Sequence, residues 1–341
     1  MSHSYAYLNG QLATGLSRIT NDLSEIDLGG KWLVLGFFEG LVLAFKFENW
    51  QQTAAPLGNW QGAGIWESNL DSTSYQDLVL RAQSQIAAGE FYQVNVCHQY
   101  RTQWKPENNI AGLFNILQKN YQSKFASLIC IEDEKLKDFG LSEIQIASAS
   151  PELFLKVENS IISSSPIKGT VESGAEFLDK DASENIMIVD LVRNDLSKVC
   201  ETASIHVPQL LERIELPNLD HLVSTVAGQL KTDTNWNEIF SATFPPGSVT
   251  GAPKSSALNF ISANEPNREI YCGAIGWVDT DTNSAELAVA IRTFWKSGNE
   301  LRFGAGAGIT WGSEPALEWS ETELKAHRLI SIANLQWEVD K

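Results

Sequence analysis

The stretch LRFGAGAGITWGSEPALEWSETELK, from Leu301 to Lys325, decides the predicted fold. Its apolar start indicates a strand, in which glycine alternates with alanine from Gly304 to Gly308. Because glycine has no Cβ, another part of the molecule can approach that strand closely. The following residues have a helical composition, and we expect Ser313 to cap this helix, with Pro315 in its first turn.

Glu318, Glu321 and Lys325 share one face of this predicted helix, because their spacing is i, i+3 and i+7. Two carboxylates and an ammonium group beside a glycine-rich strand would suit a divalent cation that holds an anionic ligand. A solvated, salt-bridged helix face is the alternative for such a triplet on its own.

Composition and charge exclude several classes of protein. The 341 residues are 43% hydrophobic, which is enough for a core in one large domain or in two. The net charge of −17 argues against nucleic-acid binding, which needs a concentrated basic surface. No basic and apolar leader opens the sequence, and no apolar run approaches the roughly 18 residues of a membrane span, so we expect neither export nor membrane insertion.

The cysteines are scattered, without a CxxC pair or clustering with histidine, so neither a zinc site nor a disulfide framework is indicated. We therefore expect a cytoplasmic location. None of them has the setting of a glutaminase nucleophile: Cys97 and Cys272 lie within predicted strands, and Cys200 follows a helical segment without an adjacent catalytic histidine. The four are Cys97, Cys130, Cys200 and Cys272.

Hydrophobic patterning predicts many strands and few helices. The pattern shows no regular βαβα rhythm, which favours an α+β fold with large, mostly antiparallel sheets packed face to face and helices on the outside. We expect one compact unit, in which a strand-rich segment of residues 1–70 joins a catalytic region of residues 71–341. Predicted strands cover residues 31–38, 41–47, 91–101, 125–132, 143–150, 153–157, 160–165, 204–207, 270–279, 285–295 and 301–310, and predicted helices residues 74–89, 181–193, 236–243, 254–263 and 314 onward.

Eight short motifs follow one another along the chain. They are SPE (Ser150–Glu152), PIKGT (Pro166–Thr170), ENIMIVDLVRND (Glu184–Asp195), HLVSTV (His221–Val226), GSVTGAPK (Gly247–Lys254), IYCGAIGW (Ile270–Trp277), AIRT (Ala290–Thr293), and GAGI followed by ExxETxxK. In this order, over roughly residues 72–335, they resemble the chorismate-utilising enzymes. The resemblance implies the fold described above and an enzyme that acts on chorismate.

Within that family the resemblance is strongest to component I of aminodeoxychorismate synthases, which serve 4-aminobenzoate and folate synthesis. Lys168 stands in PIKGT where anthranilate synthases typically have alanine, and YQVN at residues 92–95 points the same way. The family often continues PIKGT with a Pro-Arg pair, whereas this chain has VESG. Component I of anthranilate synthase is the alternative, and an isochorismate or salicylate synthase or a catalytically silent binding subunit is less favoured.

The implied reaction replaces the C4 hydroxyl of chorismate with an amino group from ammonia. By resemblance Mg²⁺ is bound by Glu184 and Glu321, with Glu318 beside them, and carboxylate oxygens are the ligands that Mg²⁺ prefers. Taken alone, Glu184 could merely complement a helix dipole. The implied substrate-binding residues are Gly169, Thr170, Ser248, Tyr271, Arg292, Gly306, Ala307, Gly308 and Lys325.

Three residues are implied in catalysis. Glu152 is the candidate general acid and base, because a carboxyl group at a desolvated strand end should have a raised pKa; a turn-capping glutamate is the alternative. His221 would orient the substrate or support the leaving group, unless it is an ordinary core residue. Lys168 would attack the chorismate ring as hydroxide leaves, forming a covalent intermediate that ammonia then displaces at C4; a purely electrostatic role is the alternative. Ammonia is expected from a separate glutamine amidotransferase subunit.

Overall fold

The computed structural model describes residues 4–121, 123–172, 174–177, 179–215 and 219–336. Every strand pair in this part of the chain is antiparallel. The strands are β1 (Tyr5–Leu8), β2 (Gln11–Thr20), β3 (Lys31–Gly36), β4 (Val42–Gln52), β5 (Glu67–Ser68), β6 (Gln93–Gln103), β7 (Phe125–Ile131), β8 (Ile144–Ser150), β9 (Leu153–Glu158), β10 (Ile161–Ser165), β11 (Ile167–Glu172), β12 (His206–Glu215), β13 (Leu219–Gln229), β14 (Gly251–Ala252), β15 (Ala274–Asp279), β16 (Ser284–Val289), β17 (Thr293–Ser297) and β18 (Glu300–Ile309).

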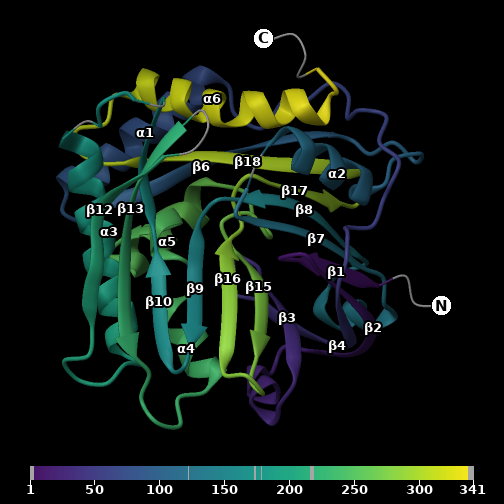
Figure 1. Cartoon of the computed structure of the whole chain (residues 1–341). Helices are drawn as coiled ribbons and strands as arrows, with labels where there is room; N and C mark the ends of the chain where they lie inside the picture. The colour runs from purple at the N-terminus through teal and green to yellow at the C-terminus, as the bar shows by residue number, and fades with distance from the viewer. Residues whose placement is uncertain (1–3, 122, 173, 178, 216–218, 337–341) are drawn as a thin grey trace.

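These strands form one continuous, curled sheet. From one edge to the other the order is β12, β13, β10, β9, β16, β15, β3, β4, β2, β1, β7, β8, β17, β18 and β6, with β11 also paired to β13 and both β5 and β14 paired to β6. Figure 1 shows the two halves of the sheet, joined by the N-terminal strands β1 to β4. The predicted fold class is therefore confirmed, and the sheets expected to face each other are halves of a single sheet.

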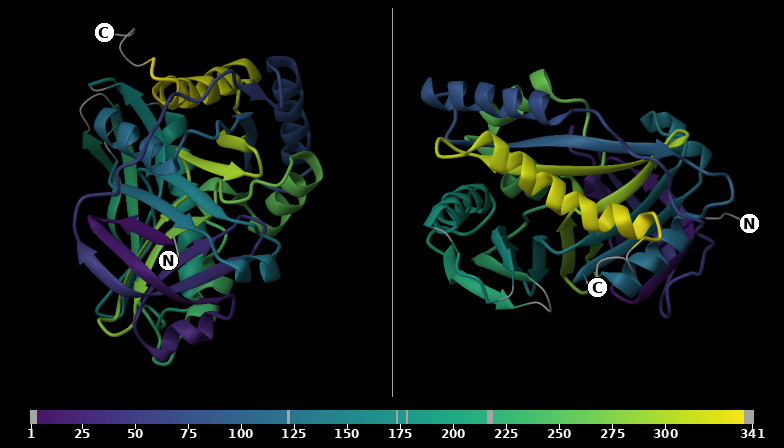
Figure 2. Two further views of the ribbon diagram at one scale, coloured as in Figure 1. Left: turned by 90° about the vertical axis from the view of Figure 1, so that its right-hand side faces the viewer. Right: turned by 90° about the horizontal axis from the view of Figure 1, so that it is seen from above.

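Helices cover this sheet from outside. Helix α6 crosses β18 and lies beside α1, α2 covers β7 and β8, and α3 packs on β11 and β13 (Figures 1 and 2). No helix in the described ranges combines the length and apolar character that a membrane crossing requires. The helices are α1 (Ser72–Ala87), α2 (Ile110–Asn120), α3 (Asp179–Ser197), α4 (Trp236–Thr243), α5 (Lys254–Asn264) and α6 (Pro315–Ala333), with short 3₁₀ helices η1 (Leu23–Leu28), η2 (Glu134–Phe139) and η3 (Gly247–Val249).

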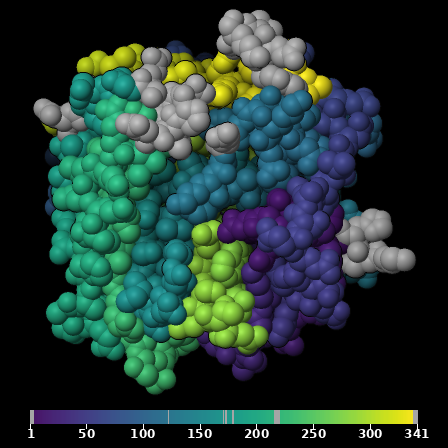
Figure 3. Space-filling view, viewed as in Figure 1, coloured from purple at the N-terminus to yellow at the C-terminus, as the bar shows by residue number. Residues whose placement is uncertain are grey.

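Two apolar cores hold the fold together. The larger fills the interior from the N-terminal strands to α3, α4 and α5, and includes the fully buried side chains of Trp32 and Phe45. The smaller lies beneath α2 and α6 and contains Phe114, Phe294 and Phe303. Each fully buried side chain of this size contributes about 1.5–3 kcal/mol to the free energy of unfolding. In the space-filling view the β15–β16 hairpin lies between the α3, β12 and β13 region and the N-terminal strands (Figure 3).

Several local predictions are wrong. The helix predicted over residues 74–89 begins two residues earlier, at Ser72, and its N-cap is Asp71, whose side chain accepts a hydrogen bond from the Ser74 amide at 2.8 Å. Ser313 does not cap α6; the N-cap is Glu314, without a side-chain capping bond, and the Ser313 hydroxyl accepts from the Thr310 amide at 3.1 Å. Residues 285–295 form two strands, because the chain bends before β17 at Arg292, which has a φ of 52°.

Candidate active site

Ser248 contacts two of the three predicted catalytic side chains. Strand β11 carries Lys168. Glu152 follows Pro151 in the two-residue link between β8 and β9. The Lys168 ammonium donates a hydrogen bond to the Ser248 carbonyl oxygen at 2.9 Å, and the Ser248 hydroxyl donates to Glu152 Oε1. The structure therefore places an amine and a carboxyl group on either side of one residue of η3.

Glu152 is a buried carboxyl group, only 4% exposed. Burial raises its pKa to about 7, although the Ser248 hydrogen bond and the charges of Lys168 and Arg292 act in the opposite direction. The raised pKa agrees with the sequence-based prediction. At neutral pH this carboxyl group can both give and take a proton, as a general acid and base must.

The glycine-rich part of β18 forms one wall of this site. A Cβ atom added to Gly308 would lie 3.3 Å from the Lys168 ammonium and 2.4 Å from Gln93 Nε2, and one added to Gly306 would lie 2.5 Å from Cys97 Sγ. Ala307 between them is buried and points to the opposite face of the strand. Glycine is therefore needed here for close packing, as the sequence predicted.

The predicted metal ligands lie on two helices that face Lys168. Burial raises the pKa of Glu184 on α3, and the negative charges of Glu318 and Glu321 on α6 raise it further. The ammonium groups of Lys168 and Lys180 act in the opposite direction. The pKa of Glu321 is lowered, chiefly by Lys325, whose ammonium lies 2.6 Å from Glu321 Oε1. The ion pairs of Lys180 with Glu184 and Glu318 bring these two carboxylates together, and Glu321 lies close enough to change the pKa of Glu184.

The donor types of this cluster fit a divalent cation such as Mg²⁺. Glu184 Oε1 is buried and accepts no hydrogen bond from any described residue. Lys180 lies among the carboxylates, with its ammonium 2.5 Å from Glu318 Oε1 and 3.6 Å from Glu184 Oε1. Within the described ranges, no group of three or more His, Cys, Asp or Glu side chains is arranged so that it could hold a metal ion while Lys180 lies between the carboxylates. Lys180 was not predicted from the sequence, although it stands at i, i+4 spacing to Glu184.

Lys325 lies next to the glycine-rich wall. Its ammonium donates to the Gly306 carbonyl oxygen at 3.1 Å, in addition to its ion pair with Glu321. Helix α6 is fixed on β18 and β6 partly by the buried His98, whose Nε2 lies 3.0 Å from the Thr322 hydroxyl. The predicted residues of α6 and β18 are thus brought together.

Arg292 supplies a second positive charge near Glu152. It lies in the bend between β16 and β17, and its guanidinium donates to the Tyr121 hydroxyl. Burial and the charge of Arg292 lower the pKa of His221 to about 4, so His221 is neutral at pH 7. Tyr121 was missed because helix α2, which it follows, was not predicted.

One predicted substrate-binding residue, Tyr271, stands apart from this arrangement. Tyr271 is buried beneath Gly304, stacks on Trp295, and has its hydroxyl 3.8 Å from Cys97 Sγ. The side chain of Thr170 lies outside the described part of the structure. Its neighbour Gly169, with a φ of 84°, lets β11 pass close to α3, since a Cβ there would lie 2.9 Å from Asp181 Cβ.

A buried ion pair that the sequence analysis missed supports the wall and η3. Arg268 and Glu265 are both almost completely buried, with Arg268 Nε 2.8 Å from Glu265 Oε2. The guanidinium also donates to the carbonyl oxygens of Asn95 on β6 and Val249 in η3, at 2.7 and 3.0 Å. This pair therefore fixes the residue next to Ser248 to the strand beside the glycine-rich wall.

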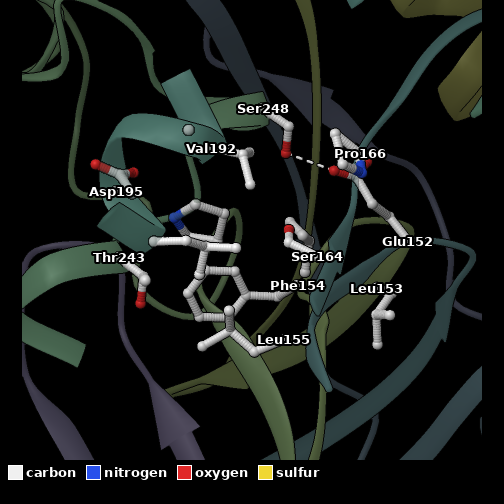
Figure 4. Close-up of a pocket in the computed structure, with 14 residues that line it drawn as sticks. Glu152, Leu153, Phe154, Leu155, Ser164, Pro166, Val192, Asp195, Thr243 and Ser248 are labelled. Carbon is white, nitrogen blue, oxygen red and sulfur yellow. Dashed lines mark hydrogen bonds between the residues drawn. The ribbon is translucent and has the colours of Figure 1, made fainter. Parts of the chain in front are cut away.

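A small cavity lies behind Glu152 (Figure 4). Its volume of about 20 Å³ is enough for one water-sized molecule, but not for a six-membered ring with two carboxylates. Glu152 and Ser248 form one side, and Asp195 on α3 lies at the other (Figure 4). Phe154 and Val192 contribute apolar walls. Lys168, Arg292 and the carboxylate cluster are not among its lining residues.

The sequence matches the model of the chorismate binding enzyme family over residues 38–331. An anthranilate synthase component 1 from Saccharolobus solfataricus is 34% identical over 278 residues, which are 78% of this chain and 63% of that protein. An aminodeoxychorismate synthase component 1 from Escherichia coli is 32% identical over 292 residues, which are 82% and 62%. The aligned part of this chain thus spans less than two thirds of the length of these relatives.

Solved structures share the fold. MenF, the menaquinone-specific isochorismate synthase from Escherichia coli, superposes with a TM-score of 0.79 at 18% identity, covering 97% of this chain and 89% of that one. Anthranilate synthase component I from Streptococcus pneumoniae gives a TM-score of 0.74 at 20% identity, covering 97% and 93%. At such identities the similarity shows the fold alone.

Proposed function

Because this chain belongs to the family of chorismate binding enzymes, we propose that it replaces the C4 hydroxyl of chorismate with an amino group from ammonia, as an aminodeoxychorismate synthase component I. The observation that carries the proposal is the contact of Ser248 with both Lys168 and Glu152. An amine placed next to a carboxyl group with a pKa of about 7 suits substitution at a ring that must lose hydroxide.

The chemistry proceeds in two substitutions. Once the Lys168 ammonium has given a proton to solvent, its amine attacks the ring and forms a C–N bond. At the same time the C4–O bond breaks, and the leaving oxygen takes the proton of Glu152 to depart as water. Ammonia then forms a bond to C4, and the bond between the ring and Lys168 breaks as its electron pair returns to the amine. The ionised Glu152 takes the proton that the bound ammonia loses, which restores the starting state.

The substrate is a dianion, and positive charges around the site would bind it. Arg292 suits a planar carboxylate because its donors form a fork, and Lys325 lies at the glycine-rich wall. Glu184, Glu318 and Glu321 would hold Mg²⁺. When bound, this cation would supply positive charge for a substrate carboxylate.

A separate glutamine amidotransferase subunit would supply the ammonia. All four cysteines of the chain are buried, so none presents a thiol that glutamine could reach. We expect the purified chain to use ammonium salts at high pH but not glutamine, as measured by product formation in parallel reactions. Glutamine-dependent turnover by this chain alone would contradict the partner requirement.

Product identification tests the function directly. Chorismate, Mg²⁺ and ammonium should give 4-amino-4-deoxychorismate, which chromatography with mass detection identifies. Adding a lyase that releases pyruvate should convert this product to 4-aminobenzoate. Anthranilate synthase is the second candidate, because a relative of that name is among the most similar proteins. Fluorescent anthranilate as the main product would overturn the proposal in favour of this alternative.

A further inference from the structure

Lys180 occupies the space between two helices where the carboxylates of the cluster meet. Its ammonium bridges Glu318 on α6 and Glu184 on α3, at 2.5 and 3.6 Å. The side chain of Glu318 is only 3% exposed and that of Glu184 11%, whereas that of Lys180 is 37% exposed. The two carboxylates are thus fixed inside the protein, while the lysine can reach solvent.

The position of Lys180 on its own helix is electrostatically unfavourable. Helix α3 begins at Asp179, so Lys180 lies in the first turn, where the helix dipole favours negative and not positive charge. What holds the ammonium there is the pair of buried carboxylates, which would otherwise carry uncompensated charge. A second cation placed on the same carboxylates would remove that attraction and repel the ammonium.

We propose that Lys180 is an internal counter-ion that neutralises Glu184 and Glu318 until a divalent cation displaces it. This inference rests on the proposed function for the metal, but it concerns the binding of the cation and not the reaction. Metal binding and the Lys180 ion pairs exclude each other, so the apparent affinity for the metal is lower than the carboxylates alone would give. Without metal, the lysine keeps the buried carboxylates paired and the two helices together.

Metal affinity in Lys180 variants tests this inference. Mg²⁺ is titrated into the metal-free full chain in an isothermal titration calorimeter. Lys180→Gln should bind Mg²⁺ at least about tenfold more tightly than the wild type, a change of about 1.4 kcal/mol or more in the binding free energy. Lys180→Arg keeps the charge and should bind Mg²⁺ like the wild type. The matched control is Lys198→Gln, directly after the end of α3, because Lys198 pairs with Asp195 at 3.3 Å outside the cluster. It should leave the affinity unchanged.

A second measurement needs no variant. In the wild type, limited acetylation followed by peptide mass spectrometry should show a several-fold faster reaction of Lys180 when Mg²⁺ is added, since its amine is then released to solvent. The exposed Lys156 on β9, which pairs with Glu158, should react at the same rate in both conditions. A rate at Lys180 that Mg²⁺ leaves unchanged or slows would overturn the inference.

The outcomes also separate this inference from the proposed function. Equal or weaker Mg²⁺ binding by Lys180→Gln refutes the counter-ion role, even if the wild type aminates chorismate. Absence of Mg²⁺ binding in both proteins refutes the counter-ion role together with the metal part of the proposed function. Formation of anthranilate in place of 4-amino-4-deoxychorismate refutes the proposed function, and the two binding measurements still decide the role of Lys180.

Discussion

At the scale of single residues, Ser248 has two separate tasks, because its hydroxyl contacts Glu152 and its carbonyl oxygen contacts Lys168. Only the first contact depends on the side chain. Substitutions at Lys168, Glu152 and Ser248 can therefore perturb the amine and the carboxyl group independently.

Lys168→Ala should abolish the covalent intermediate. Intact-protein mass spectrometry of the enzyme with chorismate and Mg²⁺, but without ammonia, should show an adduct in the wild type and none in the variant. The control is Lys156→Ala, which removes an exposed lysine paired with Glu158 and should form the adduct normally. Identical spectra for the wild type and Lys168→Ala would leave Lys168 with a purely electrostatic role.

Adduct formation should depend on the protonation of Glu152. Its pKa is raised to about 7, so the carboxyl group holds its proton below that pH and loses it above. The contribution of Glu152 to the rate constant should be level below pH 7 and fall about tenfold per pH unit above it. Rapid-quench mass spectrometry measures this profile. Glu152→Gln should form the adduct about 10²- to 10⁴-fold more slowly, and its rate should not show the fall above pH 7 that is due to Glu152. An unchanged pH profile in that variant would exclude Glu152 as the acid.

Ser248→Ala should move this pH dependence upward. The Ser248 hydroxyl lowers the pKa of Glu152, so its removal should raise the pKa and extend the protonated range to higher pH. The carbonyl contact with Lys168 remains, and the adduct should still form. The same rapid-quench profile measures the shift, and a limb that moved to lower pH would contradict the assigned hydrogen bond.

The sequence predicted the chemistry of individual residues where the cause is local. Glu152 follows a strand and a proline, and its burial could be expected from that position. The role of Lys180 could not be predicted, because its partner Glu318 is 138 positions away and the two meet only when α3 packs near α6. The bend at Arg292 was also invisible, since an arginine with positive φ gives no compositional signal.

At the scale of elements, the glycine-rich part of β18 makes room for the side chains of neighbouring elements. Gly308→Ala would put a Cβ 2.4 Å from Gln93 Nε2 and 3.3 Å from the Lys168 ammonium. We expect adduct formation to slow about tenfold to a hundredfold, since small displacements of a reacting group have effects of this size. The free energy of unfolding should change by less than about 1 kcal/mol, because the contacted atoms are ends of flexible side chains.

Gly312→Ala is the matched control for this substitution. Gly312 follows the same strand, and a Cβ there would meet no atom within 4 Å. Rapid-quench mass spectrometry measures the rate of adduct formation in both variants, and urea unfolding measures their free energy of unfolding. Together they separate an effect on the site from an effect on the fold. Equal rates for Gly308→Ala and the wild type would show that the wall does not position Lys168.

Most of the regular elements were predicted, but one helix was missed. Residues 236–243 form the predicted helix α4, and the predicted strand 301–310 is β18 with its bounds shifted by one residue. Helix α2 was missed because it is short and contains Gly112, although its polar residues recur at helical spacing. The structure shows that this helix leads to Tyr121, which contacts Arg292.

At the scale of the whole molecule, the pair of Arg268 and Glu265 connects segments from three regions of the chain. Arg268→Met would leave the carboxylate of Glu265 buried without its partner, and it would also free two backbone carbonyl oxygens. Breaking a buried pair in this way costs about 3–5 kcal/mol of the free energy of unfolding. Urea unfolding followed by circular dichroism measures the loss.

Two further variants test whether the loss of stability in Arg268→Met comes from the buried, unpaired carboxylate. The double variant Glu265→Leu with Arg268→Met should be more stable than Arg268→Met alone, since no charge then stays buried. Arg101→Met removes an exposed pair with Glu67 at 3.4 Å, and it should cost less than about 1 kcal/mol. A loss for Arg268→Met no larger than that for Arg101→Met would show that the buried pair does not support the fold.

The sequence predicted antiparallel sheets but not their union into one. Alternation of apolar residues reveals which face of a strand is buried, and it does not reveal the partner strand. Strand β3 near the N-terminus pairs with β15, for example with Leu35 opposite Ile275. Such pairing depends on the complete chain, so no local pattern could have shown it.

The same pairing has a consequence for biosynthesis. When β3 leaves the ribosome, about 240 residues that include its partner β15 are still untranslated. At a synthesis rate of about 5–20 residues per second, its unpaired edge waits for about ten seconds or longer. Such an edge can associate with other nascent chains. Slower initiation, which spaces the nascent chains, should therefore increase the yield of folded protein more than a stronger promoter would.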